Sequence, residues 1–176
     1  MSARELLMNR LFYVVRILRL DSLLVARGER HAFSDYFKGF EKVEAVRRIF
    51  GEKTEEILAN LRVEFTWVRS YMWVSNVDGH LTISSYYLNN GDKIDIYLDL
   101  IHELVHVKQF MSGKELFETN YDYIDRPTEV EAYKYAVEEA KRLGLSDGRI
   151  CRYLKTEWMS PEDHRRLAKT LNVNCP

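Results

Sequence analysis

The sequence predicts an α+β fold, in which a small antiparallel sheet packs with helices. Two observations predict this class. Apolar residues recur at helical spacing in the first third of the chain and again after residue 99, whereas residues 62–88 are rich in β-branched and aromatic residues. The 176 residues include three prolines and no repeat or low-complexity tract, so nothing indicates a linker between domains. We therefore expect one domain over residues 1–176.

An N-terminal helical region is expected over about residues 1–61. Residues 3–28 carry apolar side chains at helical spacing, and residues 41–61 form a second helical stretch. Gly51 interrupts this second stretch, because glycine weakens a helix interior.

Three strands are expected next, in the segments RVEFTWV (62–68), YMWVSNV (71–77) and LTISSYYL (81–88). The turn-forming sequences NVDGH and NNGDK accompany them, which favours antiparallel pairing. The segment IDIYL (94–98) alternates apolar and polar residues. It is either a last strand or the opening turn of the following helix, since so short a run fits both.

A buried helix is expected from about Asp99 to Ser112, followed by Gly113 as a stop. Apolar residues surround most of this helix, yet it also carries the sequence HELVH, with His102, Glu103 and His106. Each buried polar group without a partner costs about 1–3 kcal/mol. Three such groups on a buried helix therefore indicate a site.

The C-terminal third is expected to be helical. Residues 127–144, PTEVEAYKYAVEEAKRLG, have a proline near the start and a glycine at the end, and Thr128 and Glu131 have the spacing of a capping box. The C-terminal helical tail, about residues 146–176, should hold a pair of short helices. The last of them begins with Ser160 as its cap.

Charge and hydropathy exclude several partners. The net charge is -1, from 26 basic and 27 acidic residues, so no global field attracts nucleic acid or an anionic membrane. The apolar N-terminal stretch is interrupted by Arg10, Arg16, Arg19 and Asp21, and it lacks the features of a secretory signal. We therefore expect a cytoplasmic protein without a membrane or nucleic-acid partner.

The two cysteines, Cys151 and Cys175, are too few for a disulfide scaffold and too far apart for a zinc ribbon. We expect free thiols. A single glutamine and 30% charged residues are nevertheless typical of heat-adapted proteins, in which intracellular disulfides are less rare.

The HELVH sequence has the spacing of a zinc site. His102 and His106 are four residues apart, so both rings lie on one helix face and can bind one Zn²⁺ ion. Glu103 lies about 100° further round the helix, where it can reach a zinc-bound water without binding the metal. The carboxylate can take a proton as that water attacks a peptide carbonyl and then protonate the leaving amine.

Catalytic zinc needs a third protein ligand. A third histidine six residues after His106 would require glycine at 109 and histidine at 112, but these are Gln109 and Ser112. Glu129 shares a helix face with the alanines that should pack against the core, whereas Glu131 points about 200° away. We therefore predict Glu129 as the third ligand.

The sequences HELVH and TEVEAYKYA together resemble the gluzincin class of zinc metallopeptidases, especially its small soluble members, the minigluzincins. Residues 99–140 carry the resemblance. It implies a zincin-like fold in which an active-site helix is followed by a glutamate helix. By this resemblance the zinc ligands are His102, His106 and Glu129, and Glu103 is the general base and acid. The strand before the active-site helix, within residues 81–98, would border the cleft and pair with an extended substrate.

The chain departs from many gluzincins at Tyr133, where an aspartate often steadies a zinc-binding histidine. Asp99 or Asp122 would have to replace it. The donor to the developing oxyanion is open among Tyr121, Tyr123, Arg126 and Tyr133. Some small gluzincins are described as latent, with a terminal segment over the cleft, and Cys175 could then ligate zinc, but we expect a frayed terminus instead.

These features predict a zinc-dependent metalloendopeptidase, active or latent, that hydrolyses peptides or locally unfolded protein. The alternative is a catalytically silent gluzincin-like regulatory or binding protein, in contact with DNA through the basic N-terminal helix. A third reading has no metal, and the polar groups simply form hydrogen bonds. The sequence leaves the oligomeric state, substrate and cleavage preference open.

Overall fold

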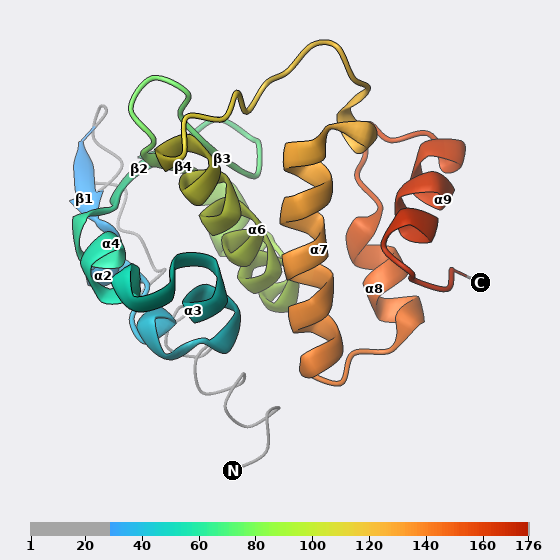
Figure 1. The fold of residues 1–176 in the computed structure, drawn as a ribbon, viewed down its shortest axis with the longest axis horizontal. Coiled ribbons are helices and arrows are strands. Elements are labelled where there is room, and N and C mark those ends of the chain that lie inside the picture. Colours follow the sequence, from blue (N-terminus) through green and yellow to red (C-terminus); the bar gives the residue numbers. More distant parts are fainter. Residues whose placement is uncertain (1–28, 176) are drawn as a thin grey trace.

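The computed structural model describes residues 29–175, so the helix expected over residues 3–28 lies outside the described part. The described chain is α+β, with helices around one four-stranded sheet (Figure 1). The strands lie in the order β1-β2-β4-β3. Their bounds are β1 Arg30–Ala32, β2 Arg62–Thr66, β3 Met72–Val74 and β4 Leu81–Ser84.

The sheet is mixed, so the expected purely antiparallel sheet is wrong. β1 pairs antiparallel with β2, and β3 pairs antiparallel with β4, but β2 and β4 are parallel, with Val63 opposite Leu81. All four residues of β4 are buried. This strand therefore takes a central place, where its apolar side chains are covered on both faces, and β3 is left at the edge.

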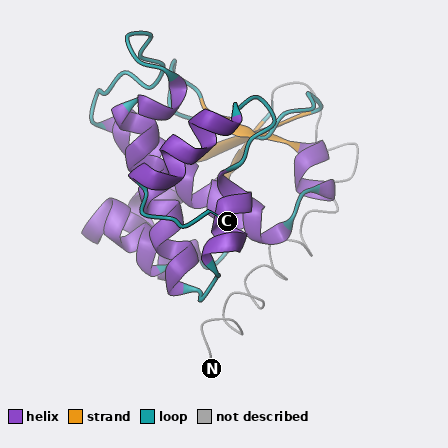
Figure 2. Cartoon of the chain, turned by 90° about the vertical axis from the view of Figure 1, so that its right-hand side faces the viewer, coloured by secondary structure: helices purple, strands orange, loops and turns teal. Residues whose placement is uncertain are grey.

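The helices pack against the sheet and against one another. Their bounds are α2 Phe33–Tyr36, α3 Glu44–Phe50, α4 Thr54–Asn60, α5 Ser85–Asn90, α6 Lys93–Met111, α7 Pro127–Arg142, α8 Asp147–Leu154 and α9 Pro161–Thr170, with 3₁₀ turns at Phe40–Lys42, Gly51–Lys53 and Tyr123–Asp125. α6 crosses the middle of the molecule with α7 alongside it, and α8 and α9 lie on the far side of α7 (Figures 1 and 2).

α6 begins earlier than expected, at Lys93. The Asp92 side chain caps it by accepting hydrogen bonds from the backbone amides of Ile94 and Asp95. Residues 94–98 therefore form the opening turns of the helix rather than a last strand. In the same way, the second half of the expected strand 81–88 forms α5, because the Ser84 hydroxyl caps it.

The central helix α6 is buried, as predicted. Leu98, Leu100, Ile101, Leu104 and Val105 have no exposed surface. Full burial of such a side chain contributes about 1.5–3 kcal/mol, so this helix is a main source of stability and a rigid support for its polar residues. In the described part, the buried apolar residues form one continuous cluster.

α7 begins at Pro127, which suits the first helical position because proline has no amide proton to satisfy. The expected capping box of Thr128 and Glu131 is therefore wrong, since both lie inside the helix. The Glu131 carboxylate instead forms ion pairs with Lys108 and Lys114. The cap at the start of α9 is confirmed, because the Ser160 hydroxyl accepts a hydrogen bond from the amide of Asp163.

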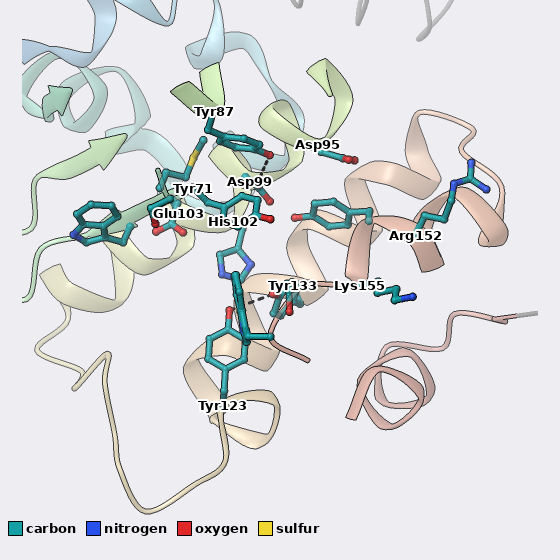
Figure 3. Close-up of a pocket in the computed structure, with 16 residues that line it drawn as sticks. Tyr71, Tyr87, Asp95, Asp99, His102, Glu103, Tyr123, Tyr133, Arg152 and Lys155 are labelled. Atoms are coloured by element: carbon teal, nitrogen blue, oxygen red, sulfur yellow. Dashed lines mark hydrogen bonds between the residues drawn. The ribbon is translucent and has the colours of Figure 1, made fainter. Parts of the chain in front are cut away.

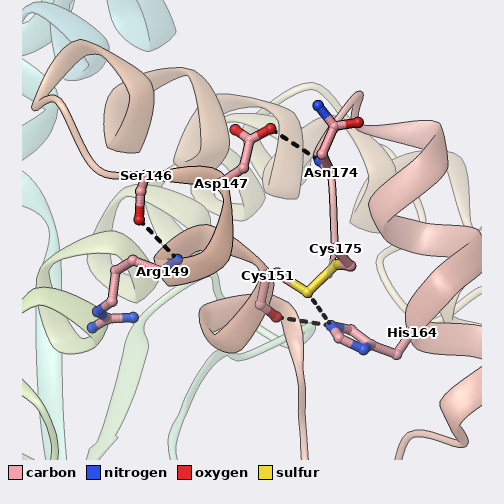
Figure 4. The surroundings of a disulfide bond; sticks show 7 residues. All are labelled: Ser146, Asp147, Arg149, Cys151, His164, Asn174 and Cys175. Carbon is pink, nitrogen blue, oxygen red and sulfur yellow. Dashed lines mark hydrogen bonds between the residues drawn. A yellow bond between two sulfur atoms is a disulfide. The ribbon is translucent and has the colours of Figure 1, made fainter.

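The cysteines are not free thiols, as had been expected. Cys151 in α8 and Cys175 form a disulfide across 24 residues of sequence, with their Cα atoms 5.4 Å apart (Figure 4). The segment after α9 folds back onto α8, where Val173 is buried and the Asn174 amide donates to the Asp147 carboxylate. The disulfide thus fixes the chain end against α8 and leaves no thiol at Cys175 to bind zinc.

We expect this disulfide to contribute about 2–4 kcal/mol to the free energy of unfolding, because it restricts the unfolded chain. The variant with Cys151→Ala and Cys175→Ala should lose that amount in chemical denaturation. A reductant should destabilise the wild type by a similar amount and leave the variant unchanged. A wild-type protein that ignores the reductant, and in which both thiols react with an alkylating reagent, would contradict the disulfide.

Candidate metal centre

α6 and α7 bring the three predicted ligands together. The Nε2 atoms of His102 and His106 are 3.0 Å apart, and the Oε2 atom of Glu129 lies 3.2 Å from the first and 3.5 Å from the second. All three side chains are buried. Tetrahedral zinc with ligands at 2.0–2.1 Å places those ligands about 3.3–3.4 Å from one another. The three donor atoms therefore have the separations that a zinc ion requires.

The orientation of His106 is fixed by Gln109, one turn later on α6. The Gln109 amide nitrogen donates to the backbone oxygen of Thr128 and to Glu131, both at 3.0 Å. Its amide oxygen therefore faces the Nδ1 atom of His106, at 2.7 Å, and accepts the proton there. When the ring loses its second proton, the lone pair is therefore on the Nε2 atom, on the side of Glu129, which is the form that binds a metal.

The electrostatics of the three groups fit a bound cation. Burial alone would lower the pKa of His106, but the Glu129 carboxylate raises it to about 9. Burial would raise the pKa of Glu129, but the two imidazoles lower it well below its ordinary value. The pKa of His102 is lowered by burial. In the metal-free protein a proton is therefore shared among the imidazoles and the Glu129 carboxylate. A bound metal ion would take the place of this proton.

Glu103 lies beside these ligands without joining them. It is buried, and one carboxylate oxygen has no hydrogen-bond partner within residues 29–175. Burial raises its pKa to about 8. A nearby dication would favour the carboxylate form, so Glu103 has the position and the proton affinity of a general base.

Two cavities meet at His102 and Glu103. The larger, about 300 Å³, has an aromatic lining and is shown in Figure 3. The smaller, about 140 Å³, also reaches His106 and Glu129 and is lined by apolar side chains such as Leu116. The smaller cavity therefore reaches all three candidate ligands, and the larger one reaches His102.

The strand that borders these cavities is β3, not the strand directly before α6. Met72 and Trp73 of β3 line both cavities. β4 comes before α5 and α6 in the chain, but it is hydrogen bonded on both sides, by β2 and β3. An interior strand has no free backbone groups, so the expected pairing of substrate with residues 81–98 is wrong for β4. The available edge is that of β3.

Neither carboxylate predicted to steady a histidine does so. Asp99 accepts a hydrogen bond from the Tyr87 hydroxyl at 2.6 Å, and Asp122 is exposed in the segment before α7. The Nδ1 atom of His102 has no hydrogen-bond partner in the described chain, and the Tyr133 ring packs edge-on against its imidazole, with centroids 4.4 Å apart. Only His106 has a supporting hydrogen bond, from a residue that the sequence analysis did not assign.

Two of the four candidate oxyanion donors lie in the larger cavity. The hydroxyls of Tyr123 and Tyr133 are 3.2 Å apart. Burial raises the pKa of both, so each keeps its proton and can donate. Tyr121 is largely exposed, and the guanidinium of Arg126 stacks over the Tyr123 ring. The geometry therefore favours Tyr123 and Tyr133 over Tyr121 and Arg126.

Comparison with family models, with curated proteins and with solved structures finds no match for the chain. Within residues 29–175, no helix is long and apolar enough to cross a membrane.

Proposed function

We propose that this protein is a zinc-dependent metallopeptidase of the gluzincin type, with a zincin-like fold, which hydrolyses peptides or locally unfolded protein in the cytoplasm. One observation carries the proposal. Donor atoms of His102, His106 and Glu129, from two helices, lie within 3.5 Å of one another beside the buried carboxylate of Glu103. Two imidazoles and one carboxylate are a ligand set of catalytic zinc.

The residues have distinct roles in the proposed reaction. When bound, zinc would polarise the peptide carbonyl and lower the pKa of a water molecule. Glu103 takes a proton from the attacking water and delivers it to the leaving amine. The hydroxyls of Tyr123 and Tyr133, which line the same cavity as Glu103, would donate to the charge that develops on the carbonyl oxygen.

The surface near the cavities suits an extended peptide. The outer edge of β3 has no strand partner in the described sheet, so its backbone can pair with a substrate. Trp73, Phe117 and Trp158 line the cavities and are each at least 36% exposed. Partly exposed aromatic side chains beside a cleft are typical of recognition surfaces.

Metal content and cleavage test the proposal. The protein should be stripped with a chelator, reloaded with zinc and analysed for metal, and it should then be incubated with a denatured protein. We expect one tightly bound zinc per chain, metal-dependent cleavage, and loss of both in His102→Ala and Glu129→Gln. Glu138→Gln is the matched control and should keep both, because this partly exposed carboxylate of α7 pairs with Arg48 and not with the ligands. A wild type without zinc, or a Glu129→Gln variant that keeps it, would overturn the proposed centre.

One observation favours a second candidate function, a gluzincin-like binding protein without catalytic activity. The Nδ1 atom of His102 has no hydrogen-bond partner among the described residues. Metal ligands without a supporting hydrogen bond bind more weakly. This candidate predicts that the zinc-loaded wild type cleaves no denatured protein or peptide. The basic segment through which it would contact DNA lies outside the described residues.

A further inference from the structure

The larger cavity contains a carboxylate that the proposed reaction does not use. Asp99 lies one turn before Glu103 on α6 and lines the cavity. Figure 3 shows it between Tyr87 and His102. Protein surrounds most of the Asp99 side chain. Its remaining exposed part faces the cavity.

No positive side chain in the described chain forms an ion pair with Asp99. Its carboxylate accepts a hydrogen bond from the Tyr87 hydroxyl at 2.6 Å. Asp95, which lines the same cavity, differs because the Arg149 guanidinium binds it at 2.5 Å. Enclosing a carboxylate without a cation is costly and raises the pKa of Asp99 to about 7, so a positive ligand would stabilise its charged form.

We propose that Asp99 makes this cavity selective for a substrate that carries a lysine or arginine side chain next to the cleaved bond. The inference rests on the proposed function, because the cavity begins at His102 and Glu103. At about 300 Å³, it is at the lower limit of ligand pockets and suits one long side chain. The rings of Tyr71, Tyr87 and Trp158 in its lining can cover the apolar stem of that side chain.

Two positively charged side chains also line the cavity. They would repel a lysine or arginine side chain, but more weakly than Asp99 attracts it. Arg152 and Lys155 are exposed, and Figure 3 shows both on the far side of the cavity from Glu103. Water and salt screen exposed charges, whereas the enclosed Asp99 acts through a medium of lower dielectric constant. The buried carboxylate therefore decides which side chain binds deep in the cavity.

Peptide binding to the zinc-loaded Glu103→Gln protein tests the inference without cleavage. The probes are alanine pentapeptides with a central lysine, arginine, norleucine or glutamate, and the measurement is calorimetric titration. A charge-assisted hydrogen bond contributes about 1.5–3 kcal/mol, so lysine and arginine should bind about 10–100-fold more tightly than norleucine. Adding Asp99→Asn, which keeps an oxygen for the Tyr87 hydroxyl, should remove the preference.

Adding Asp95→Asn is the matched control and should keep the preference, because Arg149 already compensates that charge. Equal affinity for lysine and norleucine, absence of binding by all four peptides, or a preference that survives Asp99→Asn would overturn the inference. Cleavage by the wild type is scored separately. A wild type that binds the lysine peptide selectively but does not cleave it contradicts the peptidase proposal and leaves the cavity assignment supported.

Discussion

Glu103→Gln is expected to abolish measurable peptide hydrolysis while zinc stays bound. Glu103 lies in both cavities, and its carboxylate is not part of the cluster of three ligands. Loss of a general base that also protonates the leaving group lowers kcat by about 10²–10⁴-fold. Cleavage of a denatured protein and metal analysis of the same sample measure the two properties together.

The same variant should fold at least as stably as the wild type. In metal-free protein, burial raises the pKa of Glu103 from 4.5 to about 8. The folded state therefore holds a proton that the unfolded state releases, and stability falls as the pH rises from about 4.5 to 8. Glutamine removes this loss, so at pH 7 the melting temperature without metal should equal or exceed that of the wild type.

Glu115→Gln, in the exposed segment after α6, is the matched control and should keep both zinc and activity. If Glu103→Gln loses the metal, Glu103 is a ligand rather than a base. If it keeps more than a tenth of the activity, another group takes the proton.

The clustering of the three candidate ligands could be predicted because it depends largely on local geometry. His102 and His106 are one helical turn apart, so any helix places their rings on the same face. Glu129 required one further step, the assumption that the alanine-rich face of α7 packs against the core. Ala132, Ala136 and Ala140 are fully buried, which is why that step led to the carboxylate that lies beside the two imidazoles.

The order of the strands could not be predicted from the same patterns. Alternation shows which residues form a strand, but it does not show which strand becomes its neighbour. The position of β4 between β2 and β3 depends on contacts between distant segments. Because β4 is an interior strand, the free edge beside the cavities belongs to β3 and not, as expected, to the strand before α6. The pairing of Cys151 with Cys175 was missed for a similar reason, because it requires the chain end to fold back onto α8.

The hydrogen bond between Gln109 and His106 was not predicted, although the spacing of the two residues in the sequence allows it. Gln109 stands three residues after His106, a spacing that allows a side-chain hydrogen bond on a helix. In the sequence, Gln109 indicated only that the long motif with a third histidine ligand is absent. Its full role depends on the packing of α6 against α7, since its amide nitrogen binds the backbone of Thr128 and the carboxylate of Glu131.

Gln109→Leu should therefore weaken both the metal centre and the contact between α6 and α7. The change leaves the Nδ1 proton of His106 without an acceptor and removes the side-chain hydrogen bond to the Thr128 backbone oxygen, and Gln109 is only 1% exposed. An unpaired buried group costs about 1–3 kcal/mol in the free energy of unfolding. Loss of a supporting hydrogen bond lowers metal affinity about 10–100-fold. Competition with a zinc chelator and chemical denaturation of the metal-free protein measure the two effects.

Gln109→Glu separates the two roles. A carboxylate still accepts the His106 proton, so zinc affinity should equal or exceed that of the wild type. The same carboxylate has no proton to donate to the Thr128 oxygen and repels Glu131, which accepts from Gln109 at 3.0 Å in the native protein. The metal-free variant should therefore be destabilised. Equal zinc affinity in the leucine and glutamate variants would show that Gln109 supports the packing of the helices but not the orientation of His106.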